Sequence, residues 1–155
     1  MAITEYGQYL TPELGKGRIG QFPFHEADTL AAAKPIEWGI AVQRDATRPK
    51  RAVPYDGTAR FEGIVQAGSS AANYDGPYRY EQYDPVPVMR RGRIWVEVLE
   101  DVVEGGAAVI DPTTANFRPE STATAGVSVA IGIFKSSATA GSLALLEINL
   151  PGGVA

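Results

Sequence analysis

The stretch Val86–Leu99, with the sequence VPVMRRGRIWVEVL, carries the strongest structural signal in the chain. Apolar residues alternate with other residues on both sides of Gly92. In the second half, Ile94, Val96 and Val98 share one face. A period of two is typical of a β-strand with one buried face. The stretch therefore predicts two strands joined around Gly92, and with them a β-rich fold.

Shorter segments with strand character continue on both sides of this stretch. They are residues 36–43, 51–53, 61–66, 107–110, 127–134 and 142–150. The 17 glycines and 11 prolines fall mainly between such segments and do not flank long helical runs. About eight or nine short strands with frequent turns predict an all-β domain, either a small β-barrel or a β-sandwich.

The first 35 residues have a different pattern. Glycines alternate there with aromatic and aliphatic residues, without the period of a strand or a helix, which indicates an extended N-terminal arm. Residues 29–34 could form one or two helical turns before Pro35 ends them. We therefore divide the chain into an arm, residues 1–35, and a β-rich domain, residues 36–155.

The composition predicts a folded globular domain, because 45% of the 155 residues are hydrophobic and 21% are charged. No apolar run approaches the roughly 20 residues that cross a bilayer, and residues 1–5 lack the pattern of a signal peptide. We therefore expect no membrane partner. The chain has no cysteine, which excludes disulfides and thiolate metal sites.

Charge and histidine content restrict the chemistry further. The net charge of −4 opposes general binding to nucleic acid, and the glycines form no phosphate-binding loop. His25 is the single histidine and follows Phe22-Pro-Phe, which is a poor setting for a catalytic base. We expect no enzymatic activity, no cofactor and no metal.

Three acidic residues, Glu100, Asp101 and Glu104, follow the central stretch closely. Such a group could hold a divalent cation or support acid–base catalysis. It lacks the alternating ligands of a calcium-binding loop, and we interpret it as a solvated turn.

Tyrosine and arginine residues supply the candidate contact surfaces. Tyr78 and Tyr80 belong to a group of four tyrosines that could anchor a protein interface or stack on sugar rings. Arg90, Arg91 and Arg93 form a basic group that suits carboxylates on a partner, or else a solvated strand edge.

The arm supplies a further candidate interface. Its aromatic residues Tyr6, Tyr9, Phe22 and Phe24 have no periodicity that would bury them in the chain's own core. We expect them to lie across a neighbouring subunit.

Several short motifs occur in an order that resembles a known family. They are Gly39-Ile-Ala-Val, Phe61-Glu-Gly-Ile, Tyr83-Asp-Pro-Val-Pro-Val-Met-Arg-Arg-Gly-Arg-Ile-Trp-Val, Val103-Glu-Gly-Gly and Gly132-Ile-Phe-Lys-Ser-Ser-Ala-Thr-Ala-Gly-Ser-Leu-Ala-Leu-Leu-Glu-Ile. Over roughly residues 36–150 the chain resembles the head decoration proteins, also called capsid cement proteins, of tailed bacteriophages. The long N-terminal segment departs from the simplest members.

The resemblance implies a small β-rich domain, made in the host cytoplasm, that binds the outer surface of the major capsid protein lattice. Such proteins commonly form trimers, and a dimer is also possible here. The resemblance carries over no catalytic residue.

A carbohydrate-binding β-sandwich on a virion or cell surface is the alternative. It requires Tyr78, Tyr80 and Trp95 to line an open groove. A small hydrolase is a third class, but the chain offers one histidine and no paired acidic strand ends.

Overall fold

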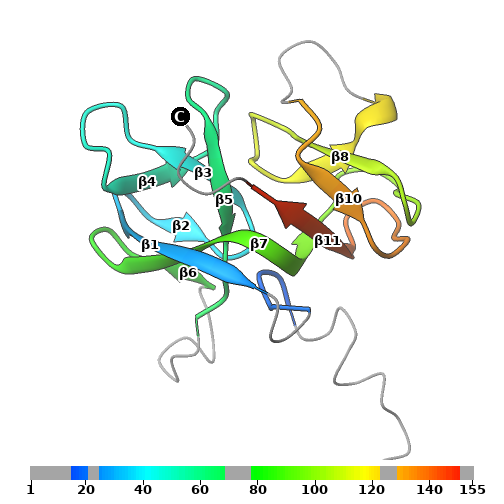
Figure 1. Ribbon diagram of the computed structural model, residues 1–155, viewed down its shortest axis with the longest axis horizontal. Coiled ribbons are helices and arrows are strands. Elements are labelled where there is room, and N and C mark those ends of the chain that lie inside the picture. Colours follow the sequence, from blue (N-terminus) through cyan, green and yellow to red (C-terminus); the bar gives the residue numbers. More distant parts are fainter. Residues whose placement is uncertain (1–14, 21–24, 69–77, 123–128, 151–155) are drawn as a thin grey trace, which may run out of the picture.

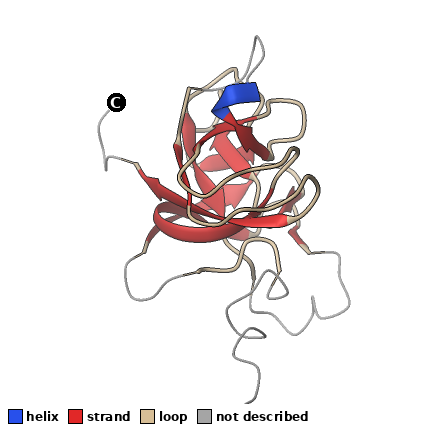
Figure 2. Ribbon diagram, turned by 90° about the vertical axis from the view of Figure 1, so that its right-hand side faces the viewer, coloured by secondary structure: helices blue, strands red, loops and turns tan. Residues whose placement is uncertain are grey.

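The computed structural model describes residues 15–20, 25–68, 78–122 and 129–150, and within them the chain is nearly all β (Figures 1 and 2). The strands in these ranges are β1 (Glu26–Ala32), β2 (Ile36–Glu37), β3 (Ala41–Arg44), β4 (Arg51–Pro54), β5 (Phe61–Val65), β6 (Arg79–Tyr80), β7 (Pro85–Glu97), β8 (Ala107–Ile110), β9 (Phe117–Pro119), β10 (Gly132–Phe134) and β11 (Leu143–Asn149). One 3-10 turn, Glu120–Thr122, interrupts them. The same ranges contain no helix that is long and apolar enough to span a membrane.

Nine of these strands form one sheet in the order β1-β4-β3-β5-β7-β11-β10-β8-β9. Strand β1 also pairs with β7, so that β1, β4, β3, β5 and β7 close into a small barrel. Strands β2 and β6 make a separate antiparallel pair. The prediction of an all-β fold with a small barrel is therefore confirmed.

The central stretch is one continuous strand of 13 residues, and the prediction of two strands is wrong. Gly92 has a φ of +130°, which glycine adopts readily, and it stays in register opposite Ile148 of β11. The first half of β7 pairs with β1 and β5, and the second half pairs with β11. The pairing with β11 thus carries the strand through Gly92.

The strands β11, β10, β8 and β9 form a second group beside the barrel (Figure 1). This group folds back onto the chain just after β7, where the Leu99 amide donates to the Phe117 carbonyl over 2.9 Å. Strand β7 therefore pairs with strands of both groups and joins them into one sheet.

The chain enters this structure earlier than the sequence predicts. Strand β1 lies within the first 35 residues and pairs with residues 85–91 of β7, so the expected helical turn at residues 29–34 is wrong. Leu30 and Ala32 are buried in the core, and a helix would break their pairing. Before β1, the Gly17 amide donates to the Trp95 carbonyl over 2.7 Å.

The buried apolar residues of both groups form one continuous core. Its largest fully buried side chains include Phe117, Phe134, Ile36, Ile64, Met89 and Ile94. Burial of this size stabilises the fold by about 1.5–3 kcal/mol for each large apolar side chain. The shared core keeps the two groups of strands in place and fixes the surfaces that they present.

Candidate interaction surfaces

One end of the barrel is polar inside. Arg90 lies two residues after the buried Val88 on β7, and alternate residues of a strand share a face. Glu62 lies where β5 shifts its register against β3, so strand alternation does not set the direction of its side chain. The 2.9 Å contact between Glu62 and Arg90 places both side chains together, near the end where β5 begins.

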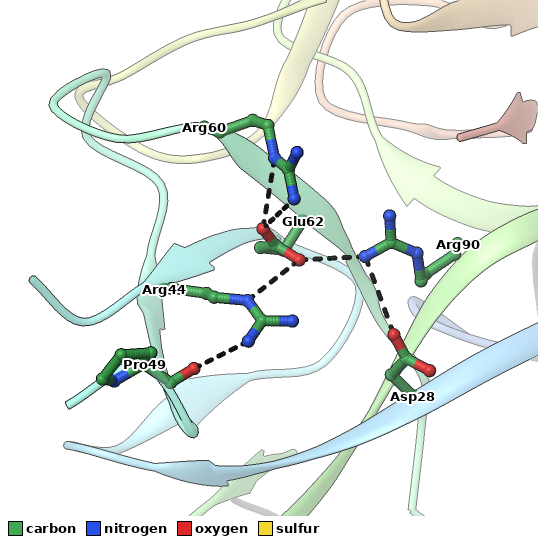
Figure 3. Close-up of polar contacts among 6 residues, drawn as sticks. All are labelled: Asp28, Arg44, Pro49, Arg60, Glu62 and Arg90. Carbon is green, nitrogen blue, oxygen red and sulfur yellow. Dashed lines mark hydrogen bonds and ion pairs between the residues drawn. The ribbon is translucent and has the colours of Figure 1, made fainter. Parts of the chain in front are cut away.

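Three arginines surround the carboxylate of Glu62 (Figure 3). Its Oε2 atom lies 2.9 Å from Nη1 of Arg90 and 3.2 Å from Nε of Arg44, and its Oε1 atom lies 3.0 Å from Nη2 of Arg60. Asp28 of β1 approaches the same Arg90 Nη1 atom at 3.6 Å. The side chain of Glu62 is only 4% exposed, so these contacts replace the water that a carboxylate requires.

Burial and arginine contacts act on Glu62 in opposite directions. Burial raises the pKa of Glu62, but the hydrogen bonds and positive charges of Arg60 and Arg44 outweigh it and hold the pKa below its usual range. Glu62 is therefore a carboxylate at neutral pH, and it locks Arg44, Arg60 and Arg90 around one end of the barrel.

The sequence prediction did not single out Glu62, Arg44 or Arg60. Glu62 stands between Phe61 and Gly63 in a short strand, where an acid is ordinarily a solvent-facing residue. The register of β5 against β3 shifts at Glu62, so strand alternation in the sequence gives no signal for its burial.

The structure gives the three arginines of the basic group three different environments. Arg90 is 13% exposed and pairs with Glu62 inside the barrel. Arg91 is 56% exposed and lies 3.6 Å from Glu26, while Arg93 pairs with Glu147 of β11 at 2.8 Å. They do not form one basic patch, and their binding to a partner remains a prediction.

Tyr78 and Tyr80 come together on Trp38. The Tyr78 ring is 58% exposed and its centroid lies 5.2 Å from that of Trp38, and the centroid of Tyr80 lies 6.5 Å from Trp38. Tyr80 donates a hydrogen bond to the Gln66 carbonyl over 2.9 Å, and burial raises the pKa of Tyr80 to about 12. Trp95 is buried in β7 and so does not line an open groove with these tyrosines.

The arm residues Tyr6, Tyr9, Phe22 and Phe24 lie outside the described residues. Their expected contact with a neighbouring subunit, and the division of the chain at residue 35, remain predictions.

The acidic group after β7 lies around a turn. The Gly106 amide donates to the Val103 carbonyl over 3.0 Å, and Asp101 Oδ1 accepts from the Ala140 amide over 2.9 Å. Among the described residues, no three acidic or histidine side chains gather closely enough to hold a metal ion.

These observations define a class of protein, namely a small β-barrel with a second group of strands attached to it. Its candidate contact residues are ion pairs at one end of the barrel and aromatic side chains near the surface. The family described as "Structural cement protein (E217 gp24/Pam3 gp6)" matches residues 2–149, and the chain belongs to this family of phage structural cement proteins. The family resemblance seen in the sequence is thereby confirmed. The protein is a component of the phage capsid with a structural role, and the carbohydrate-binding alternative is not favoured.

Solved structures show the same fold. A chain from the capsid of the Myoviridae phage XM1 has a TM-score of 0.66 at 19% identity, over 87% of this chain and 89% of that chain. The N base of head fiber gp8.5 from bacteriophage phi29 has a TM-score of 0.50 at 13% identity, over 81% of this chain and 94% of that chain. No curated protein matches the sequence.

Proposed function

We propose that this cement protein binds the outer surface of the major capsid protein lattice and strengthens the head without enzymatic activity. The observation that carries this proposal is the family match over residues 2–149. The similarity of fold to a chain of the XM1 capsid is in keeping with it.

The physical basis of such strengthening is mass action. A protein that binds the assembled shell but not its separated subunits stabilises the shell by an amount that rises with its occupancy. The ion pairs of the barrel and the shared core supply a rigid body that keeps its shape when it bridges capsid subunits.

The direct test compares capsids with and without the protein. Both are heated at matched salt, and genome release is followed with a dye that fluoresces on DNA. We expect a higher release temperature at saturating occupancy. An unchanged temperature would contradict the strengthening role, and specific binding on a glycan array would then favour the carbohydrate-binding alternative.

We further propose that copies of the chain associate on the lattice, as a trimer or a dimer, and that the arm contributes to that contact. Several simultaneous attachments hold a small protein far longer than one attachment does. A cryo-electron microscopy map of the decorated capsid tests this proposal, because isolated single copies would contradict it.

A further inference from the structure

One corner of the barrel has four cationic side chains that form no ion pair within the described part of the chain. They are Lys34, Arg48, Lys50 and Arg51. Backbone hydrogen bonds hold their loops side by side. The Ala31 amide donates to the Lys50 carbonyl over 3.1 Å, and the Ala33 amide donates to the Ala52 carbonyl over 3.0 Å. We call this surface the Lys50 patch.

Three carboxylates lie near the Lys50 patch, those of Asp45, Asp56 and Asp84. Asp45 and Asp56 each accept from the amide and the hydroxyl of a threonine two residues later, and Asp84 accepts from the Glu81 amide. Even with all three counted against the four cations, one positive charge is left over. The patch therefore suits the carboxylates of a partner.

An exposed aromatic ring belongs to the same surface. Tyr83 is 63% exposed, and Cζ of Arg51 lies 5.1 Å from the centroid of its ring. Its φ is +72°, a conformation that is strained for a bulky residue and persists only where the surrounding contacts hold it. The Tyr83 amide donates to the Ala32 carbonyl over 2.8 Å and so fixes the ring beside the cations. Tyrosine and arginine are enriched among the residues that dominate protein interfaces.

The second group of strands has the opposite charge. The described residues up to Glu97 hold twelve cationic and nine acidic side chains, whereas residues 98–150 hold two and six. Both cations of the latter range already pair with acids, Arg118 with Glu100 and Lys135 with Glu147. Three exposed acids of that range have no ion pair to a described residue, namely Asp101, Glu104 and Glu120.

Two of these acids lie in one turn, residues 101–105, which we call the acidic turn. Val103 lies between them and is 71% exposed, which is unusual for an apolar side chain. The Glu104 amide donates to Ser137 Oγ over 3.1 Å, and the Gly105 amide donates to the Phe134 carbonyl over 2.8 Å. Binding through a turn that is already ordered loses little conformational entropy.

We propose that the acidic turn of one copy docks on the Lys50 patch of a second copy. Val103 packs against the ring of Tyr83, and the Glu104 carboxylate meets Arg48 and Lys50. The loop between β3 and β4, which carries these two cations, and the turn before β8 lie at opposite ends of the molecule (Figure 1). The contact is therefore head-to-tail, and its repetition around a symmetry axis closes a ring.

This inference rests on the proposed association of copies, and the absence of cysteine offers a specific test. Two single variants, K50C and E104C, are mixed and bound to capsids under mild oxidation. A size tag on one of them makes a mixed dimer recognisable on a non-reducing gel. We expect about tenfold more mixed dimer than in a control mixture, because disulfides form only where the two Cα atoms approach to about 4.4–6.8 Å.

The matched control is the mixture of K50C with E26C. Glu26 is also an exposed glutamate, but it begins β1, whereas the contact of β1 with Lys50 lies near the end of that strand, at Ala31. Equal cross-linking in the two mixtures would overturn the proposed contact. So would the absence of mixed dimers between K50C and E104C on capsids.

A second measurement uses charge reversal, with folding checked by circular dichroism. The variants K50E and E104K each place like charges across the contact, and the double variant K50E/E104K restores opposite charges. We expect each single variant to be retained on capsids about tenfold more weakly than the wild type, and the double variant to recover most of the loss. A double variant that is retained no better than the single variants would contradict the contact.

The two proposals fail in different ways. Wild-type protein that raises the release temperature of capsids, while K50C and E104C never form mixed dimers, would retain the cement role and lose the head-to-tail contact. Weaker retention of K50E with unchanged retention of E104K would assign the Lys50 patch to the capsid and also overturn the contact.

Discussion

Arg90 donates a hydrogen bond from Nη1 to Oε2 of Glu62 across 2.9 Å, and this contact ties β7 to β5 inside one end of the barrel. Glu62 binds Arg44 and Arg60 as well, so one carboxylate connects three strands or strand ends. Because Glu62 has three arginine partners and almost no contact with water, we expect the stability of the protein to be sensitive to small chemical changes in this side chain.

Replacement of Glu62 by glutamine is expected to lower the free energy of unfolding by about 2–3 kcal/mol, because it removes a charge that compensates the nearly buried Arg90. Urea denaturation of the purified protein measures the loss. The control is Glu81→Gln, which removes an exposed pair with Arg79 and should cost less than about 1 kcal/mol. Equal losses for the two variants would contradict the structural role of Glu62.

The stability of the protein is expected to fall in acid partly through Glu62. Its pKa is lower in the folded protein than the usual value of 4.5, so its contribution is complete above that value and is lost as the pH falls through the folded pKa. Thermal unfolding from neutral pH to about pH 3 should show the gap between wild type and Glu62→Gln narrowing below roughly pH 4.5. A gap that stays constant over this range would show that Glu62 is not the titrating group.

The three arginines of the central strand are expected to differ in their effects. Arg90→Ala should cost about 2–3 kcal/mol of stability, because Glu62 then keeps only its two partly exposed partners. Arg91→Ala and Arg93→Ala should each cost about 0–1 kcal/mol, since their ion pairs are more exposed.

Capsid retention adds information that stability does not give. Arg91 is the most exposed of the three, so a loss of retention in Arg91→Ala with unchanged stability would assign it to the partner surface. A salt series separates this effect from general attraction between charges. Unchanged retention for all three alanine variants would assign the basic group to the fold and the solvent.

Truncation is expected to distinguish the arm from the sheet. Deletion of residues 1–14 should leave the β-structure folded and weaken assembly, because the hydrogen bonds of Gly17 and Gly20 to β7 remain. Deletion of residues 1–24 removes those bonds and should also lower stability. Circular dichroism and light scattering measure the two effects, and unfolding of the shorter truncation would place residues 1–14 in the core.

Gly63 is expected to tolerate no side chain. Its φ is +154°, and a Cβ atom there would lie 2.3 Å from the Met89 carbonyl oxygen of β7. Gly63→Ala should cost about 2–4 kcal/mol through strain and steric clash. Gly141→Ala is the control, since Gly141 has a φ of +81° with open space around it and should cost about 1–2 kcal/mol. A smaller loss at Gly63 than at Gly141 would refute the expected close packing of β5 on β7.

The sequence predicts the β class and most strand positions, because alternation in segments such as Ile94–Val98 reports directly on a buried face. It does not predict β1, whose residues Glu26–Thr29 are all exposed and whose place depends on pairing with β7. It likewise misses Glu62, because two of the three arginines that make its burial favourable, Arg44 and Arg90, come from distant parts of the chain. Contacts of that kind follow from tertiary structure and leave little local signal.

The shared strand β7 has a mechanical consequence. Its 13 residues complete the barrel through β1 and β5 and the second group through β11, so a load applied to one group passes along an unbroken backbone into the other. Release of β7 from the second group opens its ladder with β11, and release from the barrel opens its ladders with β1 and β5. The two groups of strands are therefore connected mechanically through the backbone of β7 itself.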